Sequence, residues 1–398
     1  MCNRWSTLAL LFAIRATMAF QFQSVAAVAP LLGRDFGVGL ADIGVLIGLY
    51  FAPGIVLALP GGAIGQRFGD KATVLAGLAL MFAGGLAMTS DSWSGQLAGR
   101  LVAGTGGVLL NVLMTKMVTD WFAGREISTA MAIFVNSWPF GLAISLLLLP
   151  AIGTAYGTNA VYLAVTVLIA VGMLILRTFY QSPGVVANKE PPKTPLDRKT
   201  AAAVIAAGLI WSLYNVGFAM IFSFGPSMLT ERGWSITAAG SAMSIVLWLA
   251  ALSVPLGGYL ADRSNRHDAI LVAGCIVFAM MLIVTPRTGA VLPSMVALGI
   301  VCGLAAGPIL SLPTRVLAPG TRAIGMGLFY TIYYLGMMFG TALGGRYAVW
   351  AGSAGGAFDF GAAVLVACTV ILWSFHRTVG TGLVPVRNAV LSISMHVS

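Results

Sequence analysis

Apolar residues dominate this chain in long continuous runs that short polar turns separate. Each run holds about 20 residues, the length that a helix needs to cross the hydrocarbon core of a membrane. The runs are continuous and do not alternate as strands of a membrane barrel do, so the pattern predicts helices. Twelve spans are expected. They cover residues 7–32, 43–65, 72–90, 95–118, 127–152, 159–178, 200–229, 236–261, 268–286, 292–316, 323–346 and 358–375.

One longer polar stretch divides these spans into two sets of six. It contains three of the five lysines and four prolines, a composition typical of a solvated linker. We therefore expect a six-helix bundle over residues 1–178 and a cytoplasmic linker over 179–199. A second six-helix bundle with a short cytoplasmic tail is expected over 200–398. The predicted fold class is an all-α integral membrane protein built from two pseudo-symmetric bundles.

The composition excludes a soluble protein. Hydrophobic residues make up 59% of the chain and charged residues 9%, against about 45–50% and about 25% in soluble domains. Of the 22 Lys and Arg, four are expected outside and two within spans, and the other sixteen lie at cytoplasmic ends, loops or tails if both termini are cytoplasmic. This bias indicates membrane topology rather than nucleic-acid binding. We expect a multi-pass protein of the inner (plasma) membrane.

The two sets of spans repeat one another. Gly62 and Arg67, in the turn after the second span, recur as Gly258 and Arg263 after the eighth span, each 196 residues later. A shared offset at separate positions indicates two similar halves in parallel orientation. Such an arrangement is typical of secondary transporters that bind their substrate between the halves.

These turns resemble a family signature. GAIGQRFGDK after the second span and GYLADRSNRH after the eighth resemble the loop motif G-x-L-A-D-R-x-G-R-[KR] of the major facilitator superfamily. Gln66 takes the position of the aspartate in the first copy, whereas the second copy keeps Asp262. The fourth span carries the family's R-x-x-x-G-x-G motif, beginning at Arg100. The resemblance implies two six-helix bundles and transport by alternating access, with helices 3, 6, 9 and 12 peripheral; those four spans are also almost wholly apolar here.

Two motifs that distinguish branches of this superfamily can also be compared with the sequence. The antiporter motif of helix 5, which ends G-P-x-x-G-G, is replaced by NSWPFG from Asn136. Arg15 followed by SVAAVAPLL is similar to the first helix of the cyanate- and nitroimidazole-transporter branch, without the proline after the arginine.

We expect the loop motif after the second and eighth spans to act as a latch that closes the cytoplasmic side. Its residues are Gly62, Arg67, Gly69, Gly258, Asp262 and Arg263.

The only charges deep within the spans are Arg15 and Arg100. All twelve acids lie at span ends, in loops or in the linker, so the field between the halves should be positive. A charged side chain at such depth is costly and indicates function, which points to an anionic solute. We expect the first half to supply charge and the second half to supply rings and amides. The expected solute contacts are Arg15, Gln23, Arg100, Asn111, Asn136, Trp138, Trp211, Tyr214, Asn215, Tyr330, Tyr333 and Tyr334.

The predicted function is secondary active or facilitative transport of a small, carboxylate-type or other monovalent anion. An efflux pump for amphiphilic drugs or other organic compounds is the alternative, because the interior is rich in aromatic and Met residues. A transporter-like sensor that moves nothing is a third reading. No GxSxG, HExxH or P-loop motif occurs in the sequence, so an enzyme is not expected. The four cysteines are scattered, and we expect no cofactor, no metal and no nucleic-acid partner; the protein should act as a monomer in the lipid bilayer.

Overall fold

The computed structural model describes residues 3–122, 126–182, 196–318 and 321–380, and all regular secondary structure in this part of the chain is helical. Twelve helical segments in it are long and apolar enough to cross a membrane, which confirms the predicted all-α architecture and the span count. The first half contains α1 (Arg4–Ala27), α2 (Ala29–Phe36), α3 (Leu40–Leu49), α4 (Ala52–Leu57), α5 (Gly61–Phe68), α6 (Asp70–Ala87), α7 (Trp93–Trp121), α8 (Ile127–Tyr156) and α9 (Thr158–Phe179).

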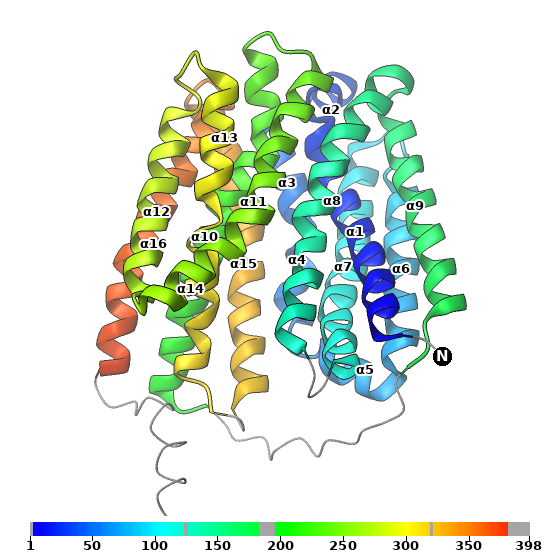
Figure 1. The fold of residues 1–398 in the computed structure, drawn as a ribbon. Helices are drawn as coiled ribbons and strands as arrows, with labels where there is room; N and C mark the ends of the chain where they lie inside the picture. Colours follow the sequence, from blue (N-terminus) through cyan, green and yellow to red (C-terminus); the bar gives the residue numbers. More distant parts are fainter. Residues whose placement is uncertain (1–2, 123–125, 183–195, 319–320, 381–398) are drawn as a thin grey trace, which may run out of the picture.

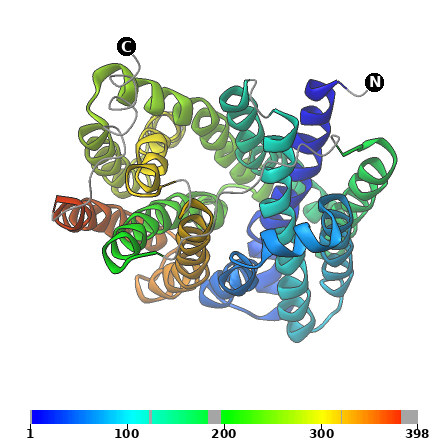
Figure 2. The same ribbon diagram turned by 90° about the horizontal axis from the view of Figure 1, so that it is seen from below.

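The second half begins after the linker. It contains α10 (Arg198–Glu231), α11 (Ile236–Ser264), α12 (His267–Val284), α13 (Val291–Cys302), α14 (Ala306–Ser311), the short 3-10 helix η1 (Pro313–Arg315), α15 (Arg322–Trp350) and α16 (Gly356–Gly380). Figures 1 and 2 show the two halves side by side, the first in blue to teal and the second in green to red.

We call the end of the molecule where α9 ends and α10 begins the linker face, and the opposite end the far face. The start of α1 and the end of α16 lie at the linker face in Figure 1. The halves pack most closely towards the far face, where α3 contacts α15 and α8 contacts α11. Glycines allow this approach: a Cβ at Gly44 would lie 2.6 Å from the carbonyl oxygen of Thr341, and one at Gly240 would lie 2.4 Å from that of Leu146.

Three spans are interrupted, and proline or hydrogen bonding explains each interruption. The first span breaks at Val28, just before Pro30, and the second breaks between α3 and α4, whose first turn contains Pro53. The tenth span breaks after Cys302. There the Tyr214 hydroxyl donates to the carbonyl oxygen of Cys302 at 2.6 Å, and the backbone N–H of the next residue donates to a serine hydroxyl of α11 at 3.0 Å. These contacts replace the backbone hydrogen bonds that the break removes.

The predicted peripheral helices are among the least buried spans. The windows of α6, α9, α12 and α16 are 33–39% buried, whereas those of α1, α7 and α10 are 61–67% buried. The α15 window is only 28% buried although α15 packs against α3 and α10. Its polar face lies between the halves, where it carries the three predicted tyrosines.

Candidate functional site

Arg15 lies at the midpoint of α1, and one end of its guanidinium is fixed by α8. Its Nη1 donates to the carbonyl oxygens of Phe134 at 3.1 Å and Val135 at 3.2 Å, and to the Ser137 hydroxyl at 3.0 Å. The guanidinium carbon also lies 4.8 Å from the centre of the Phe134 ring. The side chain is thereby held in one orientation, with only 9% of its surface exposed.

A proline in α8 makes one of these acceptors available. Pro139 has no backbone N–H, so the carbonyl oxygen of Val135, four residues earlier, loses its helical donor. An unpaired carbonyl within a membrane is costly, and Arg15 satisfies it. The proline therefore creates an arginine-binding position within a helix that would otherwise offer none.

The other edge of the Arg15 guanidinium meets α7. Both Nε, at 3.2 Å, and Nη2, at 3.0 Å, donate to the single amide oxygen of Asn111. The amide nitrogen of Asn111 donates in turn to the hydroxyl of Tyr334 in α15 at 3.3 Å. Three predicted residues are thus joined in one chain of hydrogen bonds that runs from the first half into the second.

No carboxylate balances the charge of Arg15 in the described part of the chain. Its acceptors are two backbone carbonyls, a hydroxyl and an amide, all of them neutral. The ion pairs that the structure describes lie towards the two faces, such as Arg287 with Asp359 at the far face and Arg315 with Asp268 at the linker face. A positive charge therefore stands between the halves without a counter-charge.

Arg100 occupies a separate and sealed position. It is fully buried and donates to the carbonyl oxygens of Leu46 at 3.1 Å, Gln21 at 2.8 Å and Phe22 at 2.7 Å. The rings of Phe22 and Tyr50 cover it at 5.3 and 4.7 Å. The structure does not bring Arg100 together with Arg15; it places Arg100 as a support that ties α1 and α3 to α7.

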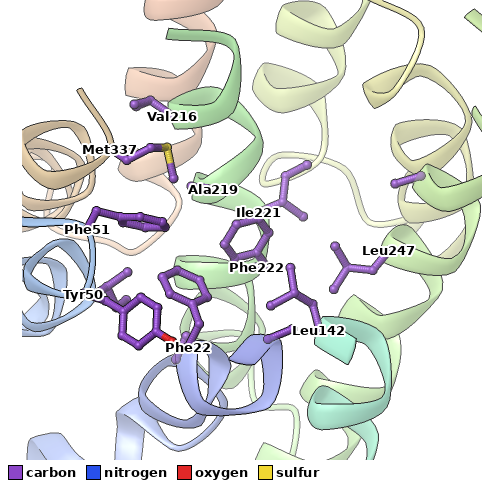
Figure 3. Packing of buried hydrophobic residues seen from close by; sticks show 14 of the residues in the cluster. Phe22, Tyr50, Phe51, Leu142, Val216, Ala219, Ile221, Phe222, Leu247 and Met337 are labelled. Carbon is purple, nitrogen blue, oxygen red and sulfur yellow. The ribbon is translucent and has the colours of Figure 1, made fainter. Parts of the chain in front are cut away.

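Aromatic rings gather where the two halves meet. Phe22 is fully buried and lies 5.0 Å from Phe51, 5.3 Å from Trp138 and 5.9 Å from Phe222, measured between ring centres. Figure 3 shows Phe22 of α1, Phe51 from the turn between α3 and α4, and Phe222 of α10 facing one another. We call these four residues the ring cluster. Because Phe222 belongs to α10 and the other three to the first half, the cluster spans the boundary between the halves.

The predicted aromatic residues of the second half extend from this cluster. The Tyr333 ring lies 6.2 Å from Phe51, 5.2 Å from Tyr334 and 6.3 Å from both Trp211 and Tyr330. Tyr330 and Tyr333 are half-buried, as is Trp211. Part of the surface of each of these three rings is therefore exposed.

Four other predicted residues are placed as follows. The Tyr214 ring stacks on Trp211, but its hydroxyl is engaged at the break in the tenth span. Asn215 donates to the Trp211 carbonyl within its own helix, and Asn136 is half-buried beside the α8 acceptors. Gln23 is fully buried and donates to the Phe222 carbonyl at 2.7 Å, which connects α1 with α10.

Among the described residues, no hydrogen bond or ion pair connects a predicted latch residue with the other half. Asp262 lies 3.0 Å from His267, and Arg263 contacts the Tyr259 hydroxyl at 3.3 Å, both within the second half. Arg67 is exposed and lies over the ring of Phe68. Gly69 has a positive φ of 84° and Gly258 has open space around it, whereas the side-chain positions of Gly62 and Gln66 lie outside the described residues.

The first turns of α6 and α12 carry ion pairs that the sequence reasoning missed. The Asp70 carboxylate accepts from Lys116 at the end of α7, and Asp268 pairs with Arg315 at 2.8 Å. Asp268 also lies 3.0 Å from His376 of α16. The two pairs occupy corresponding places in the two halves. Their shared offset of nearly 200 residues is the signal that could have found them.

Ser137 and the Val135 carbonyl were likewise missed, although Pro139 within a predicted span is a signal for a free carbonyl four residues earlier. Phe51 gave no signal, because it lies at the break in the second span.

Among the described residues, no group of three His, Cys, Asp or Glu is placed to hold a metal ion.

Known proteins resemble this chain in sequence and in fold. The sequence profile of the Major Facilitator Superfamily matches residues 11–215 and, a second time, residues 207–389. The inner membrane transport protein YajR of Escherichia coli is 23% identical over 321 residues, which cover 78% of this chain and 70% of YajR. The hexuronate transporter of Bacillus subtilis is 22% identical over 259 residues, 61% of this chain and 60% of that protein. The inward-open structure of the xylose transporter XylE from E. coli superposes with a TM-score of 0.78 at 12% identity, covering 94% of this chain and 96% of XylE.

Proposed function

This chain belongs to the Major Facilitator Superfamily, as its motifs indicated, and we propose that it carries a small anionic solute across the membrane at a site centred on Arg15. The protein is a multi-pass membrane transporter and not an enzyme. The single observation that carries the anion proposal is the charge of Arg15, which lies between the halves with neutral partners only.

An anion would resolve the electrostatic cost of that position. A charged side chain within the hydrocarbon costs at least about 2.5–3.5 kcal/mol at a helix centre, and such residues generally pair with an opposite charge. The Nε and Nη2 edge of an arginine matches the two oxygens of a carboxylate or another planar oxyanion. Arg15 presents this edge towards α7 and α15, whereas α8 holds the opposite end.

The surrounding rings favour a solute with a flat apolar part. Phe51, Trp138 and Phe222 lie beside Phe22 in the ring cluster, and Tyr333 and Trp211 continue this surface into the second half. Aromatic faces stack on flat groups and exclude water from them. A small carboxylate that carries a ring fits this combination of charge and aromatic surface best. The hexuronate transporter, a relative whose name specifies an acid, supports the choice of a carboxylate.

The arrangement also favours a mode of transport. No Asp or Glu of the described residues pairs with either deep arginine. We therefore propose exchange of anions, or symport in which the solute itself carries the proton, rather than relay through a membrane carboxylate. We assign the linker face to the cytoplasm, because basic residues concentrate there. We also place the protein in the inner membrane, as YajR is an inner membrane protein.

Transport by purified protein in liposomes tests the proposal. Labelled benzoate, glucuronate, acetate and nitrate would be supplied to the wild type, to Arg15→Gln and to Arg322→Gln. Arg322 is an exposed arginine at the start of α15 and serves as the matched control. We expect uptake of at least one of these anions by the wild type and the control, and loss of that uptake in Arg15→Gln, whose fold is checked by circular dichroism and size-exclusion chromatography.

Two results would overturn the proposal. One is uptake of these anions by folded Arg15→Gln at the wild-type rate. The other is failure of the wild type to carry any of the four anions while it carries neutral or cationic amphiphiles, which would instead support the efflux function that the sequence left open.

A further inference from the structure

The two edges of the Arg15 guanidinium are held very differently. Three acceptors of α8 surround Nη1, and two of them are backbone carbonyls that cannot move without the helix. Nε and Nη2 share one acceptor, the amide oxygen of Asn111. That amide is on a half-buried side chain, which can rotate. One edge is therefore fixed, and the other can exchange its partner.

Asn111 also forms one of two side-chain hydrogen bonds that connect the halves within the described part of the chain. Its amide nitrogen donates to the Tyr334 hydroxyl at 3.3 Å; the other bond joins Gln23 to the Phe222 carbonyl. We call the bond between Asn111 and Tyr334 the inter-half hydrogen bond. For the Tyr334 hydroxyl it is the only polar contact that the structure describes, so nothing replaces it when Asn111 turns away.

We propose that Asn111 is a stand-in for the anion at Arg15, and that a bound carboxylate displaces it and thereby breaks the inter-half hydrogen bond. This inference rests on the proposed function, because it uses the same arginine and the same class of solute. It assigns to Asn111 a positioning role: the residue detects whether the site is occupied and transmits this to α15.

The exchange follows from the relative strength of the two acceptors. The amide oxygen of Asn111 is neutral and accepts both N–H groups at one atom. A carboxylate brings a full negative charge and two oxygens, one for Nε and one for Nη2, and charge-assisted hydrogen bonds are roughly twice as strong as neutral ones. The carboxylate therefore takes the edge. Once its oxygen is released, the Asn111 amide no longer holds the orientation in which its nitrogen reaches Tyr334.

The ring of Tyr334 makes this contact consequential for the halves. It packs against α4 of the first half so tightly that a Cβ at Gly54 would lie 2.3 Å from it. Only 2% of Tyr334 is exposed. In the empty protein the inter-half hydrogen bond holds this ring in place and favours the present arrangement. The loaded protein loses that restraint, so it changes conformation more readily, and exchange of anions should be faster than their net release.

Distance measurements on the empty protein test the restraint without any solute. Spin labels would be placed at Ile127 of α8 and Ser264 of α11, exposed positions of the two halves at the linker face. Tyr334→Phe keeps the ring and removes only the hydroxyl. The control is Tyr162→Phe, which removes a buried hydroxyl that has no hydrogen-bond partner in the described chain. Asn111→Ala removes the same bond from its other side.

We expect Tyr334→Phe and Asn111→Ala to raise the population of a second distance about fivefold, the effect of one net hydrogen bond, and Tyr162→Phe to match the wild type. Benzoate added to the wild type should produce the same shift. In liposomes loaded with labelled benzoate, the ratio of exchange to net efflux should fall about fivefold in Tyr334→Phe.

Wild-type distances in both Tyr334→Phe and Asn111→Ala would overturn the restraint. If benzoate is transported in an Arg15-dependent manner but leaves the wild-type distances unchanged, the displacement of Asn111 is wrong although the proposed function stands. If the two variants shift the distances and the wild type transports none of the test anions, the restraint stands and the proposed function fails.

Discussion

Gly48 of α3 lies directly against the carbonyl oxygen of Met338 in α15: a Cβ on residue 48 would come within 2.3 Å of that oxygen. The contact is between backbones of opposite halves, and one helical turn away Gly44 meets the carbonyl of Thr341 in the same manner. Close packing of the halves towards the far face therefore depends on the absence of side chains at these positions.

Gly48→Ala should separate α3 from α15. A methyl group cannot fit beside a carbonyl oxygen at this distance, so we expect a cost of about 1–3 kcal/mol and a melting temperature lower by several degrees. Gly258→Ala is the matched control, since residue 258 is also helical and has open space where its Cβ would stand. Equal melting temperatures for the two variants would show that the helices do not approach as described.

Arg100→Gln should impair folding rather than solute binding. Three carbonyl oxygens from α1 and α3 would lose their charged donor in a fully buried position. We expect each carbonyl that is left without a donor to cost about 1–3 kcal/mol of stability, the range for an unsatisfied buried acceptor. Denaturant titration in detergent measures it. A variant that remains as stable as the wild type but no longer binds anions would assign Arg100 to the site instead.

Pro139→Ala should weaken anion binding although it repairs a helix. The new N–H at residue 139 can bond to the Val135 carbonyl, which then becomes a poorer acceptor for Arg15. With less to orient its guanidinium, Arg15 should bind benzoate about three- to tenfold more weakly. Pro150→Ala is the control, because this second proline of α8 lies three turns further along the helix. Titration of tryptophan fluorescence with benzoate would measure both variants, and equal affinities would contradict the role of Pro139.

Asp70→Asn and Asp268→Asn should both reduce stability modestly, and the first more than the second. Their carboxylates face Lys116 and Arg315 in corresponding places, but the Asp70 side chain is 17% exposed and the Asp268 side chain 41% exposed. Exposed ion pairs contribute about 1 kcal/mol or less, so Asp268→Asn should lower the melting temperature by no more than about 4 °C. Thermal unfolding followed by circular dichroism checks the order, and a larger loss in Asp268→Asn would contradict it.

Hydropathy and repetition predicted the architecture because membrane spans are set by length and polarity, and both are visible in a sequence. The depth of Arg15 was predictable for the same reason. Its partners in α8 were not identified, because two of them are backbone carbonyls: Pro139 is a signal for the Val135 carbonyl only, and the Phe134 carbonyl has none. Arg100 illustrates the limit: it is as deep as Arg15, yet only the structure shows that its acceptors are backbone atoms sealed under two rings.

The conformational state also lies outside what the sequence can indicate. Asp262 and Arg263 were expected to bridge the halves, and in this structure they pair with His267 and Tyr259 of their own half. Contacts of a latch form in only one arrangement of the two halves, whereas the same sequence adopts every arrangement of the transport cycle. The break after Cys302 was similarly hidden, since it depends on donors from α10 and α11.

The charge of this site comes from the first half, and much of its aromatic surface comes from the second. If the proposed function is correct, selectivity is divided along the boundary between the two halves. Substitutions of Trp211 or Tyr333 could change which tail an acid carries while leaving its requirement for a negative head intact. A chimera that combines the first half of this chain with the second half of another superfamily member should therefore transport a different acid.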